Sequence, residues 1–209
     1  MMLIMHADEV ANQKRALRAE LRERRRTMPQ LTRDRDTAGL TDRLDALVAA
    51  LHALSLSAYL STATEPNTRP FLNRMRDAGI RALLPVSRLD GLLDWTTGDG
   101  ETEAVSHLGV PEAVGELLGP MAINDVDVIL VPAAAVDASG MRLGWGKGYF
   151  DKMLGSMGKC PPVFAVLFDD ELVDEVPRER HDEPVDGVVT PRRIVPLSKR
   201  ARALGLPEV

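Results

Sequence analysis

Short apolar segments with the composition of buried strands alternate with helix-like segments along the chain. Residues 126–131, VDVILV, are the clearest example, because such a run suits a strand that is covered on both faces. A hairpin is predicted over 88–100, with Asp90-Gly91 as its turn, and 101–124 reads as irregular with a short helix. The other predicted strands are 54–60, 80–86, 163–168 and 185–189, and the predicted helices are 8–26, 31–53, 69–78 and 147–157.

Strands that alternate with helices predict an α/β fold with a mostly parallel central sheet flanked by helices. We expect a single domain over residues 8–200, of the Rossmann-like, three-layer type, since no repeat, low-complexity tract or interdomain linker interrupts it. Such sheets bind ligands outside the carboxyl ends of their strands. The segments 62–68 and 132–140 therefore lie on one edge of the predicted sheet, and the region after residue 168 is a further candidate.

Composition and charge narrow the function classes. The formal net charge of −5 argues against bulk nucleic-acid binding, although residues 14–35 hold nine Lys or Arg against three Asp or Glu. The single cysteine, Cys160, excludes an internal disulfide and suits a reducing compartment. No apolar stretch approaches the roughly 18 residues of a membrane span, and the first residues lack the pattern of a secretory signal. We expect a cytoplasmic monomer that acts on small molecules.

The segment 139–154, SGMRLGWGKGYFDKML, holds three glycines within five residues: Gly144, Gly146 and Gly148. Alternating glycines leave a run of backbone N–H donors exposed, and such a run can form an anion-binding concavity. A predicted helix starts directly afterwards, so its N-terminal amides favour an anion at the same place. The pattern is neither a P-loop nor G-x-G-x-x-G. A phosphate cradle and a plain glycine-rich turn with a solvated lysine both remain open from spacing alone.

The stretch 126–154 closely resembles the signature of the 5-formyltetrahydrofolate cyclo-ligases, also called methenyltetrahydrofolate synthetases. That signature is a hydrophobic strand ending in Val-Pro, an Asp-x-x-Gly turn, and Arg-Leu-Gly-x-Gly-x-Gly-Tyr-aromatic-Asp. The matching residues are Val131, Pro132, Asp137, Gly140, Arg142, Leu143, Gly144, Gly146, Gly148, Tyr149, Phe150 and Asp151.

Three further segments extend the resemblance over residues 12–190. Residues 14–18 (KRALR) resemble the family's N-terminal basic helix. Residues 59–61 (YLS), followed by EPNT at 65–68, resemble its folate-side loop. His181-Asp182, followed by Val185-Asp186, resembles its C-terminal motif.

The resemblance implies an ATP- and Mg²⁺-dependent enzyme that converts 5-formyltetrahydrofolate to 5,10-methenyltetrahydrofolate and releases ADP and phosphate. It implies that Asp151 and Asp182 hold Mg²⁺. It also implies that the folate contacts Leu60, Glu65, Trp145, Gly146, Lys147, Gly148 and Tyr149. The implied ATP contacts are Lys14, Arg18, Arg142, Leu143, Gly144, Trp145, Gly146, Lys147, Gly148, Tyr149 and Phe150.

Three positions depart from the family pattern. Trp145 stands where arginine is common, so a charged, fork-shaped donor is replaced by a flat ring that can stack on a pterin or an adenine. Phe150 stands where tyrosine is common, which is a milder change. Asn67 replaces a residue that is often acidic.

The implied chemistry agrees with the residues present. Phosphorylation of the formyl oxygen makes it a leaving group, and N10 then closes the ring. Phosphoryl transfer asks for positioning and positive charge, which Lys147 and Arg142 supply. Glu65 is expected to orient the folate through N–H groups. We therefore assign catalytic roles to these three residues.

Several other charged or aromatic residues have ordinary structural interpretations. Arg22 and Arg24–Arg26 read as a solvated basic helix face. Asp137 is expected to form a turn with Gly140. His181 and Asp186 are expected to be structural, and Trp95 is expected to pack in the predicted hairpin.

Two other function classes stay open at this stage. One is a nucleotide- or RNA-binding member of the same fold that has lost folate chemistry, favoured by the basic stretch 14–35 and by Trp145. The other is an ATP-dependent enzyme acting on a different formyl or amide substrate. Against the first stand the acidic net charge and the presence of Glu65, Lys147 and Asp151.

Overall fold

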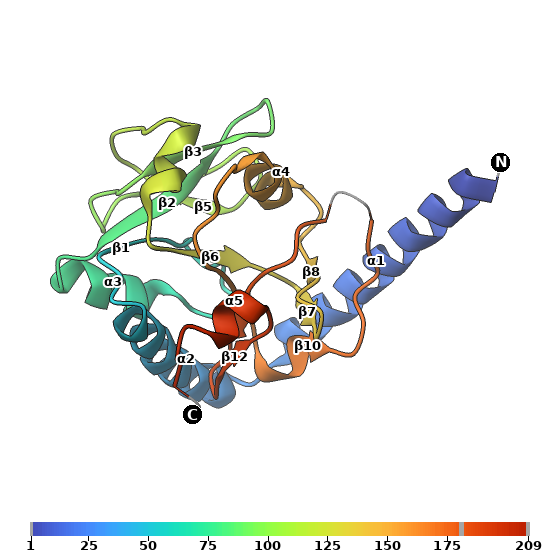
Figure 1. Ribbon diagram of the computed structural model, residues 1–209, viewed down its shortest axis with the longest axis horizontal. Helices are drawn as coiled ribbons and strands as arrows, with labels where there is room; N and C mark the ends of the chain where they lie inside the picture. Colours follow the sequence, from blue (N-terminus) through green and yellow to red (C-terminus); the bar gives the residue numbers. More distant parts are fainter. Residues whose placement is uncertain (1, 180–181, 208–209) are drawn as a thin grey trace.

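A seven-stranded sheet in the order β12-β11-β9-β6-β1-β2-β3 forms the centre of the computed structural model (Figure 1). The structure describes residues 2–179 and 182–207, with side chains from Asp8 onward. Neighbouring strands from β11 to β2 are parallel, and β12 and β3 pair antiparallel at the two edges. The strands are β1 (Ser55–Ser57), β2 (Arg81–Ser87), β3 (Leu93–Thr96), β6 (Val128–Pro132), β9 (Val163–Val166), β11 (Gly187–Val189) and β12 (Ile194–Pro196).

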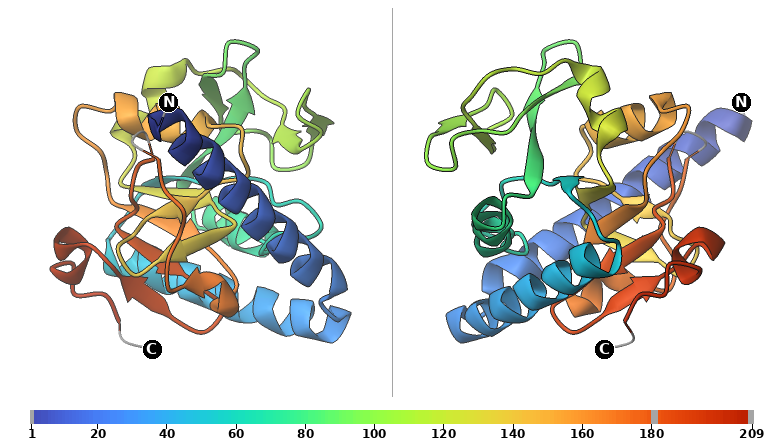
Figure 2. Two further views of the ribbon diagram at one scale, coloured as in Figure 1. Left: turned by 90° about the vertical axis from the view of Figure 1, so that its right-hand side faces the viewer. Right: turned by 60° about the vertical axis from the view of Figure 1, so that its left-hand side comes forward.

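Both faces of this sheet are buried, so successive side chains of one strand enter two different cores. In β6, Val128 and Leu130 pack with the first core, and Ile129 and Val131 with the second. Helices α2 (Gln30–Ala50), α3 (Arg69–Asp77) and α5 (Lys199–Arg202) supply the first core, and α4 (Tyr149–Ser156) with the 3-10 helix η1 (Pro120–Asp125) the second. The predicted three-layer α/β fold is confirmed, and Figure 2 shows these helices on opposite sides of the sheet.

A smaller three-stranded sheet, in the order β10-β7-β8, carries helix α1 (Met2–Thr27). Its strands are β7 (Ala135–Asp137), β8 (Arg142–Leu143) and β10 (Leu172–Val173). Leu21 of α1 packs against Ala134, Leu143 and Val176, and all four are at least 99 % buried. The first turns of α1 project beyond the body of the protein (Figure 1). No helix in the described part of the chain is long and apolar enough to cross a membrane.

The predicted elements agree with the structure in kind and differ in extent. Of the predicted strand 54–60 only Ser55–Ser57 is a strand, and the predicted helix 147–157 begins at Tyr149 because Gly148, at φ +73°, is its N-cap. The stretch 101–124, predicted to be irregular with a short helix, contains a hairpin of β4 (Glu103–Val105) and β5 (Pro111–Ala113), and the 3-10 helix η1 begins near its end. Strands of two or three residues show no periodicity, which is why β7, β8 and β10 were not predicted.

Asp137 stabilises the turn between β7 and β8 through hydrogen bonds, as predicted. Its Oδ1 accepts hydrogen bonds from Ser139 and Met141, and its Oδ2 accepts one from the backbone N–H of Val176. Gly140, at φ +86°, donates its N–H to the Asp137 carbonyl. Burial alone would raise the pKa of Asp137, but these hydrogen bonds outweigh it and hold the pKa below its ordinary value.

We predict that Asp137→Asn destabilises the protein by about 1–3 kcal/mol at pH 7, because the amide NH₂ opposes an N–H that the carboxylate accepted. A carboxyl whose pKa is lowered by folding adds stability above its unfolded pKa of about 3.9, and this stability is lost as the pH falls through the folded value. The difference from the unaltered protein should therefore shrink between about pH 5 and pH 2. Urea unfolding of both proteins between pH 7 and pH 2 measures this difference in the free energy of unfolding. Asp77→Asn, at an exposed carboxylate, is the control. A difference that does not change with pH would contradict the prediction.

Candidate functional site

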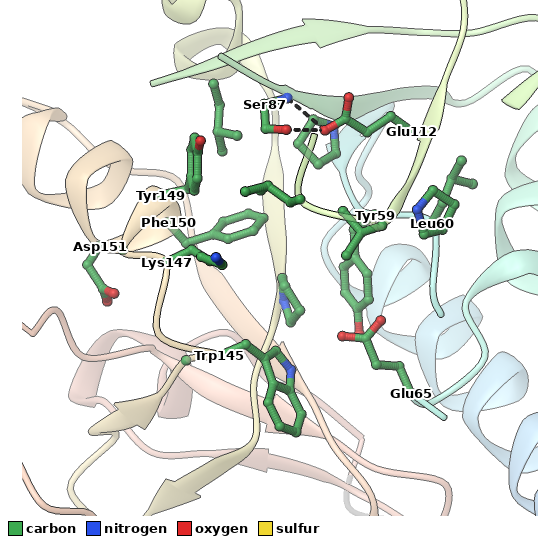
Figure 3. Close-up of a pocket in the computed structure, with 18 of the residues that line it drawn as sticks. Tyr59, Leu60, Glu65, Ser87, Glu112, Trp145, Lys147, Tyr149, Phe150 and Asp151 are labelled. Atoms are coloured by element: carbon green, nitrogen blue, oxygen red, sulfur yellow. Dashed lines mark hydrogen bonds between the residues drawn. The ribbon is translucent and has the colours of Figure 1, made fainter. Parts of the chain in front are cut away.

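A pocket lies beyond the carboxyl ends of β1, β2 and β6 (Figure 3). Its volume of about 160 Å³ is roughly ten times what a single water requires, so a ring-sized group fits. The lining residues come from segments far apart in the sequence, and they are Tyr59, Leu60, Glu65, Pro85, Ser87, Leu93, Leu108, Val110, Pro111, Glu112, Pro132, Arg142, Gly144, Trp145, Lys147, Gly148, Tyr149, Phe150 and Asp151. Two of the three segments predicted at this edge, 62–68 and 132–140, thus contribute to one site.

The glycine-rich loop, residues 144–148, connects β8 to α4. Gly146 and Gly148 have φ values of +92° and +73°, a region that residues with a Cβ rarely adopt. Gly148 caps α4, so the first amides of that helix follow the loop directly. The Lys147 side chain is exposed at the pocket and forms no ion pair with any described residue. The predicted arrangement of a glycine loop leading into a helix N-terminus is present.

Arg142 lies beneath this loop and is 96 % buried. One guanidinium nitrogen donates to the Pro132 carbonyl at 3.1 Å, and another pairs with Oδ1 of Asp151. Its Nε has no partner in the described part of the chain. The second oxygen of Asp151 is likewise unbonded among the described residues. The pair links the end of β6 to the first turn of α4, and both residues line the pocket.

The opposite side of the pocket comes from the chain after β1. Glu65 accepts the backbone N–H of Thr62 at 2.8 Å through Oε2, which shapes the loop. Tyr59 is 95 % buried, and its hydroxyl has no hydrogen-bond partner in the described structure. Burial, followed by the negative charge of Glu65, raises the pKa of Tyr59, so the phenol stays protonated. Figure 3 shows Glu65 and Tyr59 on the side away from Lys147 and Asp151.

Two basic residues of α1 approach the glycine loop from outside the pocket. Arg18 donates from Nε to the Gly144 carbonyl at 2.7 Å, and its guanidinium would contact a Cβ at Gly146. Burial and then the neighbouring Arg22 lower the pKa of Arg18, while the negative charges of Asp182, Glu179 and Asp151 oppose this shift. Lys14 is 95 % buried and contacts Glu179 at 2.8 Å and Asp182 at 2.5 Å.

The two predicted magnesium ligands each contact a basic side chain. Asp151 pairs with Arg142, and Asp182 pairs with Lys14 and accepts the Glu179 N–H. Within residues 2–179 and 182–207, no group of three or more His, Cys, Asp or Glu forms a preassembled metal site. Carboxylate oxygens are nevertheless the ligands that Mg²⁺ prefers, and two carboxylates with bound phosphates suffice for it. His181, predicted to be structural, lies outside the described residues.

Arg25 is not on a solvated helix face, so that prediction is wrong. Its side chain is 98 % buried and forms a two-point ion pair with Glu171. The guanidinium carbons of Arg22 and Arg25 lie 5.3 and 4.8 Å from the centre of the Trp145 ring. Arg25 stands four residues after Leu21 and therefore lies on the same, buried face of α1, and this helical spacing is the signal that could have indicated its burial.

Three other residues discussed from the sequence, Leu143, Trp95 and Asp186, have structural contacts. Leu143 is 99 % buried, and its carbonyl accepts the Ala134 N–H, so its side chain belongs to the small core under α1. Trp95 is fully buried in the second core, as predicted for a packing residue. Asp186 bonds to Val163, Ser198 and Arg200, which confirms its structural role.

Ser87 and Glu112 are among the pocket residues that were not predicted from the sequence. The N–H and hydroxyl of Ser87, at the end of β2, both donate to Oε1 of Glu112 on β5 (Figure 3). Both lie in parts of the chain without a recognised motif. Tyr149, at the start of α4, donates its hydroxyl to the Arg88 carbonyl at 2.8 Å, which joins the glycine loop region to the β2–β3 turn.

Curated proteins with similar sequences include 5-formyltetrahydrofolate cyclo-ligases. A 5-formyltetrahydrofolate cyclo-ligase of Mycolicibacterium smegmatis is 36% identical over 86% of this chain and 94% of its own length. One from Escherichia coli K12 is 29% identical over 83% of this chain and 98% of its own.

Solved structures with the same fold include a 5,10-methenyltetrahydrofolate synthetase of Aquifex aeolicus, with a TM-score of 0.73 and 25% identity over 89% of this chain and 93% of that chain. Another, from Mycoplasma pneumoniae, has a TM-score of 0.67 at 18% identity over 85% of this chain and 98% of that chain. The model of the 5-formyltetrahydrofolate cyclo-ligase family matches residues 10–191. The chain therefore belongs to the 5-formyltetrahydrofolate cyclo-ligase family.

Proposed function

We propose that this protein is a ligase that cyclises 5-formyltetrahydrofolate to 5,10-methenyltetrahydrofolate at the cost of ATP. Family membership supports the reaction class. The observation that supports the proposal most is that one pocket brings together the loop after β1, which carries Glu65, and the glycine loop, where Lys147 forms no ion pair with a described residue. The carboxylate of Glu65 suits a reduced pterin, which is rich in N–H donors, and the positively charged glycine loop suits a triphosphate.

The reaction needs two transfers. The formyl oxygen attacks the γ-phosphorus of ATP, which forms an O–P bond as the bond to ADP breaks. N10 then attacks the activated formyl carbon, its proton leaves to solvent, and the C–O bond breaks with release of phosphate. Positioning and positive charge at the phosphoryl group supply most of the acceleration that such transfers require. Lys147 and Arg142 are the basic side chains that line the pocket.

The nucleotide side of the proposal uses α1, the glycine loop and the start of α4. Arg18 and Lys147 offer charge to the phosphates, and the amides after Gly148 offer hydrogen bonds. Magnesium, held by Asp151 and Asp182, would neutralise charge on the phosphates. Binding requires Lys14 and Arg142 to turn from these carboxylates toward phosphate oxygens. The full proposed ATP set is Lys14, Arg18, Arg142, Leu143, Gly144, Trp145, Gly146, Lys147, Gly148, Tyr149 and Phe150.

The folate side of the proposal uses Leu60, Glu65 and the inner face of the glycine loop. Glu65 is anchored through one oxygen, so its other oxygen is available to accept N–H groups of the pterin. Trp145, Gly146, Lys147, Gly148 and Tyr149 complete the proposed contacts. Phe150 adds an apolar surface that limits water access near the reacting atoms.

Loss of folate chemistry in favour of RNA binding is not supported by a specific observation. Arg24 and Arg26 pair with Glu20 and Glu23 of the same helix, and Arg25 is buried. The basic stretch therefore offers less free charge than its composition suggests.

We also propose a cytoplasmic monomer formed by one domain over residues 8–200. The free thiol of Cys160 agrees with a reducing compartment.

We predict that Lys147→Ala lowers kcat about 100- to 1,000-fold, because a positive charge is removed from the transferring phosphoryl group. The near-ultraviolet absorbance of the methenyl product reports the rate. Lys152→Ala removes an exposed lysine of the next helix outside the pocket, and it should retain full activity. Equal rates for both variants would contradict the role of Lys147.

We predict that Glu65→Gln reduces turnover of 5-formyltetrahydrofolate at least about 100-fold while the Kd for ATP changes less than about twofold, because the carboxylate contacts the folate alone. Stopped-flow absorbance and an ATP titration measure the two effects. Glu101→Gln, an exposed carboxylate outside the pocket, serves as control. Unchanged turnover, or a matching loss of ATP affinity, would overturn this assignment.

A further inference from the structure

The Arg25–Glu171 ion pair is the most deeply buried one described, and the proposed chemistry does not use it. Each side chain is 2% exposed, and the guanidinium contacts both carboxylate oxygens, at 2.6 and 2.8 Å. Arg25 also donates to the Ala133 carbonyl, directly after β6. Glu171 accepts the Phe168 N–H as well. The pair therefore joins α1 to the ends of two central strands, next to the pocket.

The Arg25 guanidinium lies between two aromatic rings. Its carbon is 4.8 Å from the centre of the Trp145 ring and 5.6 Å from that of Phe168. Cation–π attraction is stronger where the cation is removed from water, as Arg25 is. The fork to Glu171 leaves the guanidinium plane little freedom to rotate, so the ring that stacks on it is held in one orientation.

Trp145 in turn forms part of the pocket, on the same wall as the glycine loop. It lines the cavity together with Glu65 and Tyr59, and Figure 3 places its indole across from Glu65. Its outer contacts are the α1 arginines and the small core of Leu21 and Leu143. Any tilt of the indole would change the width of the pocket at the Glu65 side.

We propose that Arg25, fixed by Glu171, is a positioning residue that holds the Trp145 indole as a wall of the folate subsite. This inference rests on the proposed function for the identity of the ligand. Arg25 touches no substrate atom and acts through Trp145. It sets the affinity for the folate. Among the proposed nucleotide contacts only Trp145 itself depends on Arg25, so the contacts from Lys14, Arg18 and the backbone of the glycine loop stay unchanged.

The test must separate positioning from stability, because Arg25→Ala alone leaves the Glu171 carboxylate buried without a partner and endangers folding. The double variant Arg25→Met/Glu171→Gln removes both charges, keeps similar volumes and retains an acceptor for Phe168. Arg26→Met is the matched control, since Arg26 is exposed and pairs only with Glu23. Thermal unfolding first establishes that each variant is folded.

Two readouts then follow for the folded variants. Tryptophan fluorescence without ligand reports the surroundings of Trp145, because the other tryptophan, Trp95, is fully buried in the second core. A Trp145→Phe reference isolates its signal. Steady-state kinetics give KM for 5-formyltetrahydrofolate and for ATP separately. The same double variant in a Trp145→Ala background tests whether Arg25 acts through the ring.

We expect the double variant to shift the Trp145 emission and to raise KM for the folate about tenfold, with KM for ATP within twofold. In the Trp145→Ala background the same change should raise KM no further. Unchanged emission overturns the inference, and so does an equal rise of both KM values or an additive effect in the Trp145→Ala background. Absence of turnover in the unaltered protein would instead refute the proposed function, and the emission comparison would still decide whether Arg25 positions Trp145.

Discussion

Burial of the central sheet on both faces is the constraint on which the rest of the structure depends. Because β6 packs into two cores with successive side chains, no polar group can sit along its length without loss of stability. Binding groups are therefore confined to the loops beyond the carboxyl ends of the strands. There the chain after β1 supplies carboxylate and phenol groups, and the chain after β6 turns through a small sheet into the glycine loop.

Helix α1 completes the site from outside, and this gives its basic residues three distinct roles. Lys14 pairs with Asp182, Arg18 bonds to the Gly144 carbonyl, and Arg25 stacks on Trp145. The helix is attached to the small sheet by Leu21, so the spacing of its residues sets which neighbour each basic group reaches. Lys14 and Arg25 are held in ion pairs, so Arg18 on the outer side of the glycine loop and Lys147 at the pocket are the basic groups that this loop leaves for the proposed nucleotide.

Much of this architecture follows from the sequence. Apolar strand runs and the turn of Asp137 with Gly140 predict the main sheet and the glycine loop after it, because these depend on local periodicity and turn chemistry. The partners of Arg25 and Ser87 lie 146 and 25 residues away and cannot be identified from one sequence, although the spacing of Arg25 from Leu21 does indicate a buried helix face. Trp145 combines the two cases: its place in the pocket is predictable, whereas its stacking on α1 is not.

The most direct measurement of the central claim is the absorbance of methenyltetrahydrofolate when the unaltered protein is mixed with 5-formyltetrahydrofolate, ATP and Mg²⁺. We expect the product to form only when ATP is present, and its formation to stop when EDTA removes the metal. A folded protein that binds ATP and yet forms no methenyl product would contradict it, and the pocket beside the glycine loop would then have to serve a different substrate.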